Sequence, residues 1–156
     1  MPDSGQQQEW HPRHSPWMIA LGVMLATFMQ VLDTSIANIA LPHIAGSLSA
    51  TPEEATWVLT SYLVSNAIIL PMTGWLGNHF GRKRVFITCI GMFTFSSVLC
   101  GMAVNLPMLI AARVLQGAGG GAMVPIAQAT MLESFPPQKR GIAMATFAQA
   151  VVVAPI

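Results

Sequence analysis

The sequence predicts an all-α, polytopic membrane protein, and three features support this prediction. Of the 156 residues, 53% are hydrophobic and only 8% are charged, whereas soluble domains average about 25% charged residues. Apolar segments of membrane-spanning length follow one another along the chain. Lys and Arg gather in alternate connecting segments, as they do in proteins that cross a bilayer repeatedly.

The chain starts with a polar, Pro-containing segment, 1–16, which we expect to be a disordered cytoplasmic tail. It lacks the basic start and cleavage site of a signal peptide. Four segments then reach the length of about 20 apolar residues that a span needs. They are 17–39, 55–77, 85–104 and 107–132. A fifth segment, 141–156, is shorter, so we interpret the chain as a fragment that stops inside a helix.

The distribution of basic residues predicts the orientation. If the spans alternate in direction, six basic residues fall on one side: Arg13, Arg82, Lys83, Arg84, Lys139 and Arg140. The connections on the other side, 43–54 and 104–106, contain no Lys or Arg. Because Lys and Arg favour cytoplasmic loops, we expect the N-terminus to be cytoplasmic.

Two charged residues, Asp33 and Arg113, fall well inside predicted spans. Charges at bilayer depth are rare and mark functional sites. At 1.5 Å per residue, Asp33 lies about 24 Å from the start of its span and Arg113 about 10 Å from the start of its own, which runs the opposite way. In a core of about 30 Å the two charges therefore lie at similar depth. Pairing would offset part of an insertion cost of about 2.5–3.5 kcal/mol for each.

Two interpretations of this pair stay open. It can be a structural ion pair that locks two helices together. Alternatively, Asp33 can line a wet cavity, which the polar residues that follow it favour. These are Thr34, Ser35 and Asn38.

The fourth span has further features of a cavity-lining helix. Arg113, Gln116 and Gly117 fall at i, i+3 and i+4, on one helix face. Gly117 and Gly121 form a G-x-x-x-G spacing, which lets another helix approach closely. Pro125 removes one backbone hydrogen bond and favours a kink. Ordinary helix packing also explains the glycines.

Two segments resemble motifs of the major facilitator superfamily. GWLGNHFGRKRV is similar to that family's loop motif between helices two and three, G-x-L-a-D-r-x-G-r-k. It matches at Gly74, Leu76, Gly81, Arg82 and Lys83. RVLQGAGGGA is similar to the motif R-x-x-Q-G-x-G-a of the fourth helix. It matches at Arg113, Gln116, Gly117 and Gly119.

Two more segments resemble the fourteen-helix drug:proton antiporters within that superfamily. LDTSIANIALP is similar to their first-helix motif, and VVVAPI to the start of their fifth-helix motif. With the motifs in order, the chain is identified as a member of the EmrB-like multidrug exporters.

This resemblance implies the N-terminal part of a two-bundle transporter, with four full helices and a truncated fifth. It implies proton-driven export of small hydrophobic or cationic compounds by alternating access across the inner membrane, with no cofactor and no enzymatic activity. A periplasmic adaptor and an outer-membrane channel are the implied partners, besides membrane lipid. With a net charge of only +1, the sequence does not indicate a nucleic acid partner.

The resemblance also implies roles for individual residues. Asp33 would exchange protons, while Arg113 and Gln116 adjust its affinity for them and Asn38 completes the site. The loop residues would control conformational change, and they are Gly74, Gly81, Arg82 and Lys83. Asn78 stands where the loop motif has Asp, so it cannot supply that charge. Arg82 and Lys83 can therefore act mainly as topology anchors.

Three alternatives stay open. One is a carrier of the same superfamily for another small solute, such as a sugar. Another is a small, non-transporting membrane assembly protein. A membrane enzyme is the weakest, because the sequence has no metal-ligand spacing or nucleophile–base pair.

Overall fold

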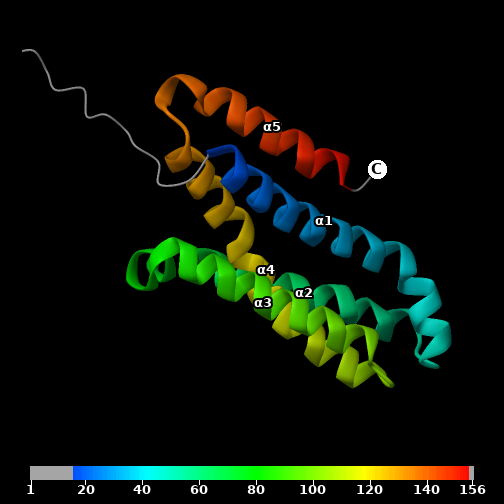
Figure 1. Ribbon diagram of the computed structural model, residues 1–156. Coiled ribbons are helices and arrows are strands. Elements are labelled where there is room, and N and C mark those ends of the chain that lie inside the picture. The colour runs from blue at the N-terminus through cyan, green and yellow to red at the C-terminus, as the bar shows by residue number, and fades with distance from the viewer. Residues whose placement is uncertain (1–15, 155–156) are drawn as a thin grey trace, which may run out of the picture.

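The structure, a computed structural model, describes residues 16–154, and within this range all of the regular secondary structure is helical, without β-strands (Figure 1). Its five α-helices are α1 (Pro16–Ser47), α2 (Pro52–Leu76), α3 (Arg82–Gly101), α4 (Leu106–Ser134) and α5 (Arg140–Val153). The start of α1, the α2–α3 turn and the α4–α5 connection lie at the same end, on the left in Figure 1. We call this the basic end. The predicted tail, apart from Pro16, lies outside the described residues.

Three helical stretches within residues 16–154 are long and apolar enough to cross a membrane. They are Pro16–Ser47, Pro52–Gly101 and Leu106–Ser134. The second stretch contains both α2 and α3, and in Figure 1 the chain turns at the basic end so that α3 runs back in the opposite direction to α2. Within this stretch the chain therefore reverses direction between two helices.

The turn between α2 and α3 differs from the predicted loop. A five-residue π-helical turn, Gly77–Gly81, joins the helices directly. Gly81 has a φ of +86°, which glycine adopts without the steric cost that a Cβ would add. Because the chain reverses so tightly, Arg82, Lys83 and Arg84 form the first turn of α3 and not a loop.

The first helix is longer than the predicted span, 17–39. It continues through Pro42 to Ser47, giving 32 residues. At 1.5 Å per residue this helix is about 48 Å long, which exceeds the bilayer core of about 30 Å. The apolar run therefore marks the hydrophobic part of α1 but not its end.

Local capping fixes where two of the helices begin. Thr51 caps α2: its hydroxyl accepts from the Glu54 N–H at 3.2 Å, and the Glu54 carboxylate accepts from the Thr51 N–H at 2.9 Å. This capping box satisfies backbone donors that the helix leaves free. Asn105 caps α4 by accepting from the Met108 N–H at 2.9 Å.

The centre of the bundle is α4, which packs against α2 and α3 and also contacts α1 and α5. Its glycines permit this approach. A Cβ on Gly121 would lie 2.7 Å from the carbonyl oxygen of Asn66 in α2, and a Cβ on Gly119 would lie 3.0 Å from that of Cys89 in α3. Ser65 of α2 donates to the α4 backbone at 2.7 Å. The glycine face of α4 thus sets the distances between the helices.

The outward faces of the helices are covered by large apolar side chains. Leu21, Leu25, Leu63, Ile68 and Phe95 are all more than half exposed. Exposed apolar surface on this scale is uncommon for a monomeric protein in water. It suits contact with lipid chains or with further helices.

We predict that Gly117→Ala destabilises the bundle by about 1–3 kcal/mol, because the added Cβ would collide with the backbone carbonyl of Tyr62. The measurement is the thermal unfolding midpoint of the full-length protein in detergent. Gly91→Ala is the matched control, since nothing lies within 4 Å of a Cβ there. Equal midpoints for the two variants would contradict the close α2–α4 approach.

Candidate functional site

An ion pair joins α1 to α4 in the interior of the bundle. Nη1 of Arg113 donates to Oδ2 of Asp33 at 2.7 Å. The Arg113 side chain is 9% exposed and the Asp33 side chain 21%, so the carboxylate keeps some access to its surroundings. The similar depths of the two residues left pairing open, and the structure shows the pair. A role in proton coupling stays a prediction.

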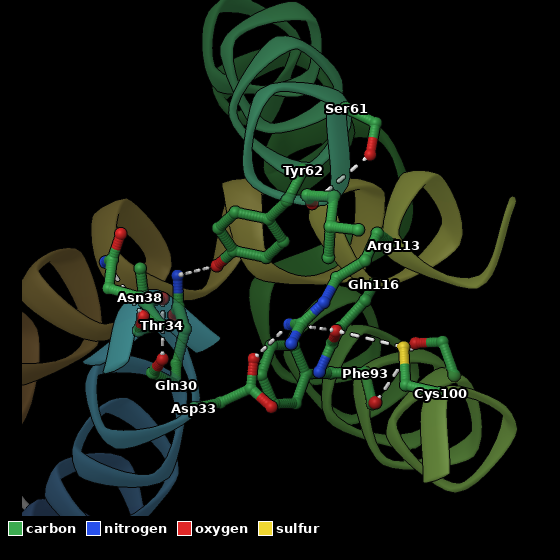
Figure 2. A network of polar contacts seen from close by, with 12 residues as sticks. Gln30, Asp33, Thr34, Asn38, Ser61, Tyr62, Phe93, Cys100, Arg113 and Gln116 are labelled. Carbon is green, nitrogen blue, oxygen red and sulfur yellow. Dashed lines mark hydrogen bonds and ion pairs between the residues drawn. The ribbon is translucent and has the colours of Figure 1, made fainter. Parts of the chain in front are cut away.

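Gln116 holds the guanidinium from the other side. Nη1 of Arg113 also donates to Oε1 of Gln116 at 2.8 Å, and Gln116 is fully buried. The Cys100 thiol of α3 lies 3.6 Å from the same oxygen. Figure 2 shows the guanidinium between Asp33 and Gln116, with Cys100 beyond. The contacts therefore run from α1 through α4 to α3.

A second polar contact between α1 and α4 was missed from the sequence. Nε2 of Gln30 donates to the Gly120 carbonyl at 3.1 Å and lies 3.4 Å from the Tyr62 hydroxyl of α2. Gln30 is three residues before Asp33, hence on the same face of α1. That spacing, together with an amide inside an apolar span, was the signal that could have revealed it.

The site has unused hydrogen-bonding capacity. Gln30 Oε1, Arg113 Nε and Gln116 Nε2 are buried and have no partner among the residues described. Buried polar atoms usually have one. Asp33 also borders a pocket of about 240 Å³, together with Met29 and Ser97. The site can thus accept further polar groups beside the ion pair.

The structure does not bring Asn38 into this group. Its side chain is exposed and donates to the Thr34 carbonyl of its own helix at 3.0 Å. Five residues after Asp33, it points about 140° away around a helix of 3.6 residues per turn. The match to the first-helix motif therefore did not indicate on which face of α1 the Asn38 side chain lies.

At the basic end, Arg82 of α3 forms an ion pair with Glu133 of α4. Arg82 thus joins two helices, beyond the topological role considered for it. Lys83 is exposed and lies beside a different groove, between α1 and α3. Arg82 also lines a pocket of about 250 Å³ between α2 and α4. Gly74, Asn78 and Pro125 line it too.

The sequence of residues 23–156 matches the family described as the Major Facilitator Superfamily. The chain belongs to the major facilitator superfamily. The buried Arg113–Gln116 pair and the tight glycine turn at Gly81 thus lie in the fourth-helix and loop motifs of a superfamily member.

Several curated proteins are similar to the chain. "Multidrug export protein EmrB" of Haemophilus influenzae is 50% identical over 139 residues, which are 89% of the chain and 27% of that protein. EmrB of Escherichia coli is 45% identical over 139 residues, 89% of the chain and 27% of EmrB. "Fatty acid resistance protein FarB" of Neisseria gonorrhoeae is 45% identical over 138 residues, 88% and 27%. The chain thus spans about a quarter of the length of these relatives.

We predict that Arg113→Met costs about 3–5 kcal/mol of stability, because it leaves a partly buried carboxylate without its counter-ion. Asp33→Asn leaves the Arg113 guanidinium without its counter-ion in the same way. The double variant should lose less than the sum of the two single losses. Thermal unfolding of all four proteins measures this coupling. Strictly additive losses would mean that the two charges do not interact.

Proposed function

We propose that this chain forms part of a proton-coupled exporter of hydrophobic or cationic drugs that works by alternating access. The ion pair between Asp33 and Arg113 carries the proposal, because it places a titratable carboxylate between two helices of a transporter family. The likeness to EmrB proteins, which are named multidrug export proteins, supports the substrate class.

The pair provides a physical link between a proton and helix packing. A proton bound to Asp33 removes the negative charge opposite Arg113. The guanidinium, with its side chain 9% exposed, is then left without a counter-ion, which is costly in a buried site. The protonated protein therefore favours another arrangement of α1 against α4. Loss of the proton restores the pair, so the proton gradient can drive the cycle without a cofactor.

Gln116 and Gln30 act as positioning residues in this scheme. Gln116 keeps the guanidinium oriented, and Gln30 ties α1 to the α4 backbone one turn from Asp33. Their unpartnered atoms provide sites for water or for polar groups of a substrate. Asn38, on another face of α1, stays a proposed contact with substrate in the full-length protein. Gly117, Gly121 and Pro125 let α4 pack closely and bend.

Alternating access also needs contacts at the basic end that form and break. The Arg82–Glu133 pair joins α3 to α4 there, and both side chains are accessible to solvent. With Asn78 in place of the motif's Asp, Glu133 supplies the carboxylate opposite Arg82. Gly81, with its positive φ, allows the tight turn on which this contact depends. Gly74 lines the same pocket as Arg82.

The distribution of Lys and Arg supports a cytoplasmic basic end and N-terminus. Residence in the inner membrane, with a periplasmic adaptor and an outer-membrane channel as partners, is proposed from the resemblance to EmrB-like exporters. The likeness to FarB, named for fatty acid resistance, supports fatty acids as a second substrate class.

We predict that Asp33→Asn abolishes proton-driven efflux of a fluorescent cationic dye from inverted vesicles that contain the full-length protein. Asparagine has nearly the size of aspartate but cannot exchange a proton. Asp33→Glu should retain part of the activity, since it keeps a titratable carboxylate. A parallel assay with a fatty acid distinguishes the two substrate classes.

Glu53→Gln is the matched control, because it neutralises an exposed carboxylate in the first turn of α2. It should leave efflux unchanged. Activities are compared at equal amounts of folded protein in the vesicles. Unchanged efflux by Asp33→Asn over a range of pH would refute the coupling role.

A further inference from the structure

An apolar groove of about 480 Å³ opens between α2 and α3 near the basic end. The small side chains of Ala118 and Ala122 in α4 form its floor. Leu76 and Phe80 line one side and α3 lines the other. Because α4 packs against both α2 and α3, it keeps these two helices apart and leaves the groove between them. The Ile69 and Met92 side chains line the end of the groove farther from the basic end.

One cationic side chain, Arg84, lines this groove. No carboxylate within residues 16–154 lies within ion-pair distance of it, whereas its neighbour Arg82 is paired with Glu133. Arg84 is exposed and belongs to the first turn of α3. Among the described residues, the groove therefore joins a positive charge that has no carboxylate partner to an apolar surface.

We propose that this groove binds an anionic phospholipid, with its phosphate on Arg84 and part of one acyl chain between α2 and α3. From Arg84 to Met92 the helix rises about 12 Å, so the groove follows the direction that an acyl chain takes into the bilayer. Basic pockets between helices on the cytoplasmic side bind anionic lipid head groups. Charge favours this occupant over an apolar helix, which would offer the Arg84 guanidinium no negative group.

The neighbouring side chains suit the same depth. Trp75 is 60% exposed and stacks on His79, with ring centroids 5.2 Å apart. Phe80, which lines the groove, packs edge-on against both rings. Tryptophan is enriched where the bilayer core meets the head groups. This aromatic cluster indicates that the mouth of the groove lies at head-group level.

The test is native mass spectrometry of the full-length protein in detergent with equal amounts of phosphatidylglycerol and phosphatidylcholine. One favourable basic contact is worth about 1 kcal/mol, so wild type should retain phosphatidylglycerol with about a fivefold preference. Arg84→Gln should lose this preference. Ala118→Leu, which fills the floor but keeps the charge, should reduce retention of both lipids.

Lys83→Gln is the matched control. It removes the same charge one residue away, beside the other groove between α1 and α3. It should keep the preference. Equal loss in Lys83→Gln and Arg84→Gln would overturn the proposal, because it would indicate a general effect of surface charge.

Two further results would also overturn it. Displacement of phosphatidylglycerol by soluble glycerol phosphate would mean that the site binds free phosphate and not a lipid. Self-association of the protein that Ala118→Leu abolishes, without lipid retention, would mean that a helix of a second copy fills the groove. Lipid retention is measured without transport. The result therefore tests the lipid site separately from the proposed export activity.

Discussion

The ion pair between Asp33 and Arg113 is the interaction on which the arrangement of α1 and α4 depends. A guanidinium inside an apolar bundle requires an opposite charge and hydrogen-bond acceptors, and Asp33 and Gln116 provide them. The Gln30 contact with the Gly120 carbonyl reinforces the same helix pair. Because α1 meets α4 through polar groups as well as through packing, a change of charge at Asp33 acts directly on the interface.

The glycine face of α4 makes this arrangement possible. Gly117 and Gly121 bring α2 within backbone contact, and Gly119 does the same for α3. This close approach buries Gln116 completely and keeps Arg113 away from lipid. It also separates α2 from α3 and so leaves the groove beside Arg84. One row of small residues thus determines both the interior site and an outer surface of the bundle.

The helices and the charged pair could be predicted from the sequence, because hydropathy and depth along a helix depend only on position in the chain. The faces of α1 were harder to predict. Asn38 belongs to the motif but points elsewhere, whereas Gln30 lies in the site and no motif indicated it. The Arg82–Glu133 contact depends on how two helix ends meet, which hydropathy does not encode. The tight turn at Gly81 required a backbone geometry that the pattern alone did not specify.

In the proposed function, Asp33 exchanges a proton when the full-length protein changes state. It is tested most directly by adding a cationic drug to the purified full-length protein in weakly buffered detergent solution and recording the pH. We expect proton release on drug binding by wild type and none by Asp33→Asn at the same occupancy of drug. Equal release by both proteins would contradict it and would assign the exchanged proton to another group.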